Sequence, residues 1–361
     1  MVKGSQYRTI ADKQIRYRIR VNPLRVGLLG KSMAKAEAQG EAAEVRRIVD
    51  EELSQQFRLG GHPDYDYLLE NVTDEADYEH EREDGVELCI MYVDLRNFSK
   101  RALFVDDPGY ETIHTIASLK QRAVSTWIKL ARYYQGHIHS ITGDGLMVLI
   151  GGKQEYDSDT WTLGARAFLT ALRVLESESM LNEELREHLR QKGLEEYAAS
   201  SDNLLDIKVA VDFSPSTLMN PQGVVVRLGD ERIPVGEVKA TSFHVDSCAK
   251  LLTYYKDAKE RLDGSPKLGR VLLLGEEYKE LMAFNDDKVS VFPIGSYKRQ
   301  MYNVEKSYAG YYIDVKEFKD NILTLSDVAA LCNVFDASKG SNGAEDTSLK
   351  IARGVRIQHG L

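Results

Sequence analysis

The sequence lacks the long hydrophobic runs and the paired cysteines that mark several classes of protein. No apolar run approaches the roughly 18–20 residues that a membrane-spanning helix needs. Cys89, Cys248 and Cys332 are odd in number and far apart, which excludes a disulfide scaffold or a cysteine-based metal site. Residues 1–20 are polar and basic and lack the apolar core of a signal peptide, so we expect a cytoplasmic protein with no membrane partner.

Basic residues are also fewer than acidic ones. The 361 residues include 47 Lys and Arg against 56 Asp and Glu, which gives a formal net charge of −9. This acidic balance argues against a nucleic-acid partner. The sequence also contains no P-loop, no GxGxxG motif and no serine nucleophile elbow, which removes three common enzyme classes.

The distribution of apolar residues predicts three regions. Residues 1–84 form a helical N-terminal extension, with helical apolar spacing over 41–59 followed by an acidic linker. Residues 85–306 carry the strand and helix patterns of a folded domain. Residues 307–361 are rich in Gly, Ser and Asn and are expected to form an accessory tail.

Within the central region, extended and helical patterns alternate. Strands are expected at 86–95, 204–214, 224–230 and 270–275, hairpins at 137–152 and 289–305, and helices at 110–134, 157–175 and 241–255. Strands interleaved with helices in this order predict an α+β fold, a mixed sheet of ferredoxin-like kind with helices on one face.

Two acidic residues stand where strands end. Asp94 closes the first strand, and Asp144 lies at the tip of the Gly-Asp-Gly hairpin. Each alone fits a turn or a helix cap, but two carboxylates at one sheet edge are a common way to hold Mg²⁺ or Mn²⁺. Backbone N–H groups of residues 95–98 can cradle phosphate. His137 and His139 alternate on the next strand, with no third zinc ligand near them.

These motifs resemble those of the class III nucleotide cyclases. The resemblance rests on YVDLRNFSK, a long helix, and HIHSITGDGLMVLIGG, and it covers residues 86–305. It implies the cyclase catalytic fold and a metal site at Asp94, Leu95 and Asp144. Two divalent ions, Mn²⁺ or Mg²⁺, would serve attack of the ribose 3′-hydroxyl on the α-phosphorus with release of pyrophosphate.

The second half of the chain departs from the family pattern. Where the family has Asn and Arg four residues apart on a helix, this chain has Asp246 and Lys250, which we assign as catalytic. An ordinary surface salt bridge between them is the alternative. Lys298 and Arg299 are candidates to bind the β- and γ-phosphates. The resemblance also implies a homodimer in which Asp246 and Lys250 complete the site of the other protomer.

In the class III cyclases, residues at two positions contact the nucleotide base. At these positions this chain matches neither the adenylate nor the guanylate cyclase pattern. Ser140 stands where adenylate cyclases have Lys and guanylate cyclases have Glu, and Lys239 falls at the second reading position. Tyr92 shares a strand face with Asp94 and is bulky enough to favour a smaller base. The expected substrate-binding residues are Tyr92, Arg96, Asn97, Phe98, Ser140 and Lys298.

This combination is similar to the bacterial pyrimidine cyclases of the Pycsar anti-phage systems. The resemblance implies conversion of UTP or CTP to a cyclic monophosphate, which a separate effector protein reads. Two alternatives stay open. One is a divergent adenylate or guanylate cyclase. The other is an inactive homologue that binds nucleotide and scaffolds a partner.

Overall fold

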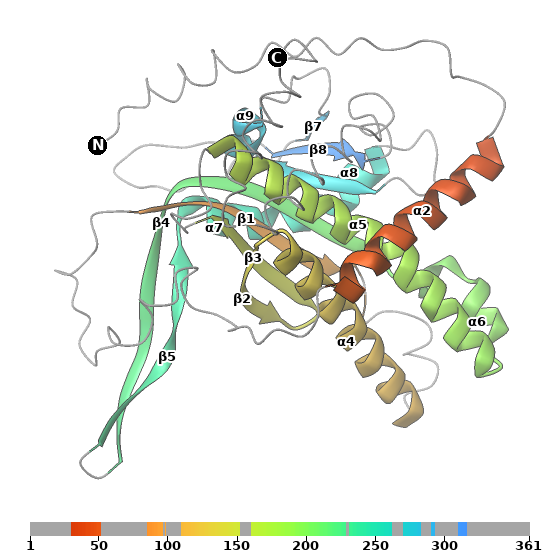
Figure 1. Ribbon diagram of the computed structural model, residues 1–361, viewed down its shortest axis with the longest axis horizontal. Helices are drawn as coiled ribbons and strands as arrows, with labels where there is room; N and C mark the ends of the chain where they lie inside the picture. The colour runs from red at the N-terminus through yellow and green to blue at the C-terminus, as the bar shows by residue number, and fades with distance from the viewer. Residues whose placement is uncertain are drawn as a thin grey trace.

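The computed structural model describes residues 30–51, 85–96, 98, 110–151, 160–228, 231–261, 270–282, 290–292 and 310–315 (Figure 1). The helices of four or more residues are α2 (Gly30–Glu51), α4 (Tyr110–Tyr133), α5 (Thr160–Gln191), α6 (Glu195–Ala199), α7 (Phe243–Leu251), α8 (Tyr255–Arg261) and α9 (Glu276–Leu281). The strands are β1 (Val86–Leu95), β2 (His137–Thr142), β3 (Gly145–Gly151), β4 (Ile207–Leu228), β5 (Glu231–Thr241), β6 (Val271–Gly275), β7 (Ser290–Phe292) and β8 (Gly310–Asp314). None of the described helices is long and apolar enough to cross a membrane.

The strands form one mixed sheet with the order β2-β3-β1-β4-β6-β8-β7, and β5 pairs with β4 outside this path. Strand β1 is antiparallel to both of its neighbours, β3 and β4. Strands β4 and β6 are parallel, whereas β8 is antiparallel to β6 and β7. The predicted α+β fold with a mixed sheet is therefore confirmed.

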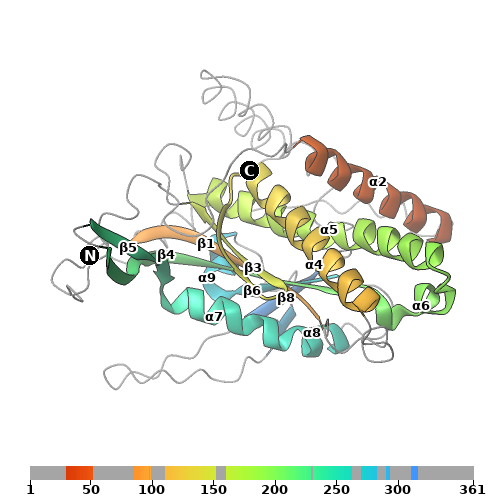
Figure 2. The same ribbon diagram turned by 90° about the horizontal axis from the view of Figure 1, so that it is seen from below.

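Helices cover both faces of the sheet (Figure 2). On β1, Cys89, Met91 and Val93 belong to the core cluster under α4, α5 and α2. The alternate residues Leu88 and Ile90 pack with α7 and α8 on the opposite face. The expectation of helices on one face was wrong, because a nearly continuous apolar strand such as β1 needs cover on both sides.

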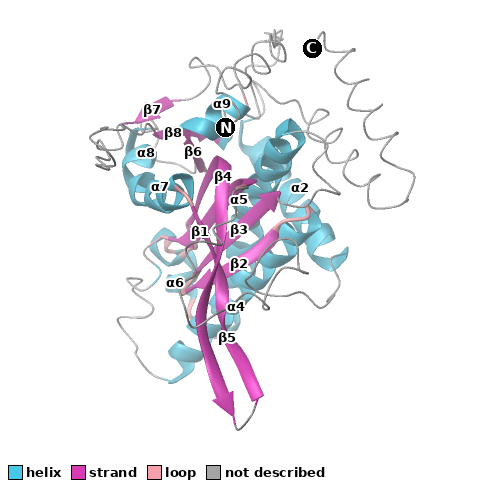
Figure 3. Ribbon diagram, turned by 90° about the vertical axis from the view of Figure 1, so that its left-hand side faces the viewer, coloured by secondary structure: helices cyan, strands magenta, loops and turns pink. Residues whose placement is uncertain are grey.

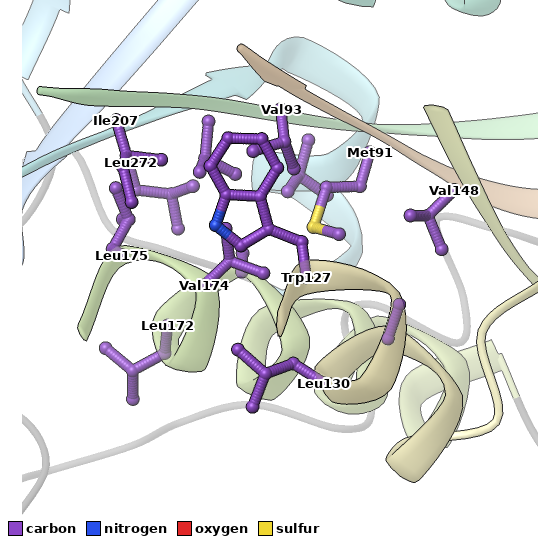
Figure 4. Close-up of a cluster of buried hydrophobic side chains, with 14 of the residues drawn as sticks. Met91, Val93, Trp127, Leu130, Val148, Leu172, Val174, Leu175, Ile207 and Leu272 are labelled. Atoms are coloured by element: carbon purple, nitrogen blue, oxygen red, sulfur yellow. The ribbon is translucent and has the colours of Figure 1, made fainter. Parts of the chain in front are cut away.

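The larger core centres on Trp127 of α4, which is fully buried (Figure 4). Its indole ring lies among aliphatic side chains from β1, β4, β6 and α5, including Val93, Ile207 and Leu272. The indole Nε1–H donates a hydrogen bond to Ser177 Oγ at 3.2 Å. This bond satisfies the one polar group of the buried indole ring.

The N-terminal helix α2 is part of this core. Val45 and Ile48 are fully buried against it. The Arg270 guanidinium, just before β6, donates to the Glu41 carboxylate at 2.7 Å. The helix predicted at 41–59 is thus observed from Gly30, and it packs on the domain rather than standing apart from it.

Strand β4 runs without a break through 22 residues and extends beyond the sheet as a hairpin with β5 (Figure 3). We call residues 218–228 and 231–241 the β4–β5 arm. The strands expected at 204–214 and 224–230 are therefore parts of one strand. Pro221 pairs with Val238 in the two-stranded arm, where an edge position tolerates proline.

The sheet also continues past the predicted domain end at residue 306. Gly310–Asp314 forms β8, in which Tyr312 pairs with Leu273 of β6. Strand β7 pairs with β8, and the remainder of the hairpin expected at 289–305 lies outside the described residues. A five-residue strand set beyond a polar segment carries too weak an alternation to be recognised from sequence.

Candidate functional site

Strands β1 and β3 bring Asp94 and Asp144 to one end of the sheet. The last registered pair between these strands is Val93 with Leu146. Asp94 follows that pair by one residue and Asp144 precedes it by two, in the β2–β3 turn. Both carboxylates are partly exposed. The second strand of the hairpin, not the first as expected, lies beside β1, and the register brings the two acidic residues to the same end of the sheet.

Two glycines permit the turn that carries Asp144. Gly143 has a φ of +63°, a conformation that residues with a Cβ rarely adopt. A Cβ at Gly145 would approach the Val93 carbonyl oxygen to 2.8 Å, so a side chain here would push the turn away from β1. The Gly-Asp-Gly sequence therefore holds Asp144 close to the end of β1.

Tyr92 and Ser140 lie in one row across three strands. Tyr92 of β1 pairs with Met147 of β3, and Met147 pairs with Ser140 of β2. Tyr92 and Met147 both pack in the cluster on the α7 face. Strand alternation places Asp94 on this same face, so the proposed acidic and base-reading residues share one side of the sheet.

Lys208 is a site residue that the sequence analysis missed. It pairs with Asp94 across β1 and β4, and its ammonium forms an ion pair with the Asp94 carboxylate. The side chains are 18% and 29% exposed, so both charges remain reachable from solvent. The available signal was a single lysine inside the apolar strand IKVAV.

The surroundings of Tyr92 keep its phenol protonated. Burial raises the pKa of Tyr92, and the nearby Cys248 and Asp246 raise it further. A neutral phenol is a hydrogen-bond donor, which suits recognition of a carbonyl or ring nitrogen.

Helix α7 presents Asp246 and Lys250, and its start is fixed by two contacts. The Val245 N–H donates to Ser242 Oγ at 3.1 Å, which caps the helix. His244 Nδ1 lies 3.1 Å from Oδ2 of Asp212, a fully buried residue of β4. Asp246 is exposed and Lys250 is partly exposed. The helix is thus anchored on the side that faces the sheet, with Asp246 on its outer side.

The Arg96 side chain is bound to Asp206, away from the row of Tyr92, Met147 and Ser140. Its guanidinium donates to Asp206 Oδ2 at 3.1 Å, and the same carboxylate accepts from Tyr255 and Lys259. Burial raises the pKa of Asp206, but Lys259, Tyr255 and Arg96 outweigh this effect and lower the pKa overall. The structure therefore gives Arg96 a role in closing the end of β1 against α8.

The other predicted residues divide into three groups. Leu95 and Phe98 are buried in the core on the α4 side, so any contact with a ligand comes from their backbone. Lys239 is partly exposed on β5. Asn97, Lys298 and Arg299 lie outside the described residues.

The donor set at the end of β1 fits a divalent cation. Among the described residues, no group of three or more His, Cys, Asp and Glu gathers at one point. Asp94 and Asp144 nevertheless offer carboxylate oxygens, which Mg²⁺ and Mn²⁺ prefer, and such ions usually take their other ligands from water and phosphate. Asp94 already binds a positive group, the Lys208 ammonium.

Comparison with known proteins agrees with the motifs. No family model matches the sequence. A cytidylate cyclase from Staphylococcus aureus is 26% identical over 196 residues, which are 53% of this chain and 37% of that protein. The chain therefore spans little more than a third of this relative. The relative is a nucleotide cyclase by name, as the sequences around Asp94 and Asp144 predict.

Solved structures of cyclases also show similarity. A guanylyl cyclase is 13% identical, with a TM-score of 0.40 over 63% of this chain and 93% of that one. An adenylyl cyclase from P. aeruginosa is 15% identical, with a TM-score of 0.36 over the same shares. A bacterial light-regulated adenylyl cyclase is 12% identical, with a TM-score of 0.41 over 70% of this chain and 57% of that one.

Proposed function

We propose that this protein is a pyrimidine nucleotide cyclase that converts UTP or CTP to the 3′,5′-cyclic monophosphate and pyrophosphate. The observation that carries the proposal is the shared face of β1, β2 and β3. On it, Asp94 and Asp144 reach one end of the sheet, next to the row of Tyr92, Met147 and Ser140. The name of the Staphylococcus aureus relative supports a pyrimidine substrate.

The reaction is an internal displacement at phosphorus. The 3′-oxygen of the ribose loses its proton and bonds to the α-phosphorus, and the bond from that phosphorus to the bridging oxygen breaks to release pyrophosphate. Catalysis of this kind depends on positioning and on stabilising negative charge. Lys208 and Lys250 supply positive charge for this purpose, and Asp246 orients the ribose or Lys250.

Asp94, Asp144 and the backbone of Leu95 are the groups that would hold the divalent ions. Such ions neutralise charge on phosphate oxygens and make the attacking hydroxyl more acidic. To hold a metal, the Asp94 carboxylate would have to give up its ion pair with Lys208. We propose that Lys208 then turns to a phosphate oxygen on the same face, because its charge requires a new partner.

Base selection belongs to the row across the three strands. Tyr92 is a neutral donor, and the Ser140 hydroxyl both donates and accepts. A small base with a carbonyl and a ring nitrogen can bond to both groups. Sites built on such bonds reject analogues that leave a buried partner unpaired. We further propose a cytoplasmic homodimer with shared sites, whose product reaches a separate effector in anti-phage defence.

Product analysis tests the proposal. The purified chain is incubated with ATP, GTP, CTP and UTP, each with Mn²⁺, and the products are separated by mass spectrometry. We expect a cyclic pyrimidine monophosphate from the wild type and a loss of at least about 100-fold in Asp94→Asn and Asp144→Asn. Asp257→Asn, a change at an exposed residue of α8, is the matched control and retains activity.

Other products would identify the alternatives. A cyclic purine as the main product would contradict the assignment of Tyr92 and Ser140 while leaving the acidic residues in place. An absence of product from all four nucleotides, with a Mn²⁺-dependent rise in melting temperature that Asp94→Asn removes, would indicate an inactive nucleotide-binding homologue.

A further inference from the structure

Strand β2 contains one extra residue opposite β3, and that residue is His139. Ile138 pairs with Val148, and Ser140 pairs with the very next residue of β3, Met147. The register therefore shifts by one residue at His139, which marks a β-bulge. Bulges re-aim the side chains that follow them.

The bulge decides which face Ser140 occupies. Ile138 is buried on the α4 face with Val148. In an unbroken strand Ser140 would point to that same apolar side, since residues two apart share a face. The extra residue instead pairs Ser140 with Met147, on the face of Tyr92. Without the bulge, Ser140 is absent from the row.

The imidazole of His139 ties the bulge to the β4–β5 arm. His139 is 5% exposed, and its Nε2 accepts a hydrogen bond from the Ala240 N–H at 3.3 Å. Ala240 pairs with Met219 at the base of the arm and follows Lys239. The bond therefore joins the strand of Ser140 to the strand of Lys239 across 101 residues of sequence.

We propose that His139 is a specificity-positioning residue: its bond to Ala240 holds the bulge that turns Ser140 toward Tyr92 and so sets the preference for the base. This inference rests on the proposed function. A residue without an acceptor at position 139 releases the Ala240 N–H and lets β2 pair in the regular register. Ser140 then leaves the row, and one of the two polar groups that contact the base is lost.

Nucleotide binding tests the inference without requiring turnover. The 3′-deoxy forms of UTP, CTP, ATP and GTP lack the attacking hydroxyl and cannot cyclise. Their dissociation constants with Mn²⁺ are measured by isothermal titration calorimetry for the wild type, His139→Leu, His139→Ala, His139→Gln and His137→Ala. His137 is the matched control, because it is also buried on β2 but pairs with Leu149, before the bulge.

We expect the wild type to prefer a pyrimidine nucleotide by at least about tenfold and His139→Leu to reduce this preference about tenfold. His139→Ala gives the same result and replaces the Leu variant if that one does not fold. His139→Gln keeps most of the preference, because its amide oxygen can accept from Ala240. His137→Ala keeps it as well, although both histidines are buried.

Three results would overturn the inference: an unchanged preference in the folded Leu or Ala variant, an equal loss in His137→Ala, or no base preference in the wild type. Failure of the proposed function has a different signature. In that case the wild type binds the 3′-deoxy pyrimidine selectively but forms no cyclic product from UTP or CTP.

Discussion

Tyr278 of α9 couples stability to pH. It is fully buried, and its hydroxyl donates to the Gly164 carbonyl oxygen at 2.7 Å. Burial raises its pKa well above the ordinary value, with a smaller contribution from Cys89. The unfolded chain ionises this phenol near pH 10, whereas the folded chain keeps it protonated. The stabilisation is therefore complete below about pH 10 and is lost as the pH rises further.

The substitution Tyr278→Phe isolates the contribution of the Tyr278 hydroxyl to the free energy of unfolding. At pH 8 we expect the variant to be less stable by about 1–2 kcal/mol, because the hydrogen bond to Gly164 is lost. Above pH 10 the difference from wild type should shrink by about 1.4 kcal/mol per pH unit. Urea unfolding at pH 8, 10 and 11 measures it. Parallel stability curves would show that the phenol ionises equally in the folded and unfolded states.

Strand periodicity predicted part of the site. The alternation over 86–95 correctly placed Tyr92 with Ile90 on one side of β1. Periodicity could not identify Lys208 as a site residue, because only the register between β1 and β4 reveals that Lys208 faces Asp94. The bulge at His139 was equally hidden, since an extra residue leaves the sequence pattern of a short strand almost unchanged.

Helix α2 should contribute to the stability of the whole domain. Ile48 is fully buried in the main core. Ile48→Ala removes three carbon atoms from a packed site, and we expect the free energy of unfolding to fall by about 2–5 kcal/mol. Chemical denaturation followed by Trp127 fluorescence measures the loss, because this indole lies in the same cluster.

Arg46→Ala is the control on the same helix. Its ion pair with Glu183 measures 2.7 Å, but the side chains are 45% and 60% exposed. Such a pair contributes about 0–1 kcal/mol. Equal losses for Arg46→Ala and Ile48→Ala would indicate that α2 does not pack as a buried element.

Element order was predictable only in the first half of the domain. The strands and helices from Val86 to Gln191 followed from apolar periodicity. The strands expected at 204–214 and 224–230 are one strand, and β5, the partner that holds the arm together, was not expected. The place of β8 depended on pairing with β6, a contact that is distant in sequence.

The proposed homodimer predicts complementation between two inactive variants. If Asp144 of one protomer works with Lys250 of another, Asp144→Ala and Lys250→Ala chains are each inactive alone. In an equimolar mixture, half of the dimers combine the two variants and hold one intact site each. We expect about a quarter of wild-type activity after mixing, measured as cyclic product per total protein.

A mixture that regains no activity would show where the complete site lies. Asp246 and Lys250 lie on α7, which packs against β1 of the same chain through Cys248. A mixture as inactive as its components would place the complete site within one chain. Size-exclusion chromatography of the mixture confirms that both variants assemble, so that failure to dimerise is not mistaken for this outcome.

The ion pair between Glu41 and Arg270 bears on how the protein is made. The two residues are 229 positions apart, so Glu41 leaves the ribosome long before Arg270 does. At synthesis rates of 5–20 residues per second, the interval is about 10–45 s. During that time the apolar stripe of α2 lacks part of its final contact surface. The growing chain therefore passes through a period in which this helix is open to chaperones, and a pause in translation before residue 270 would lengthen it.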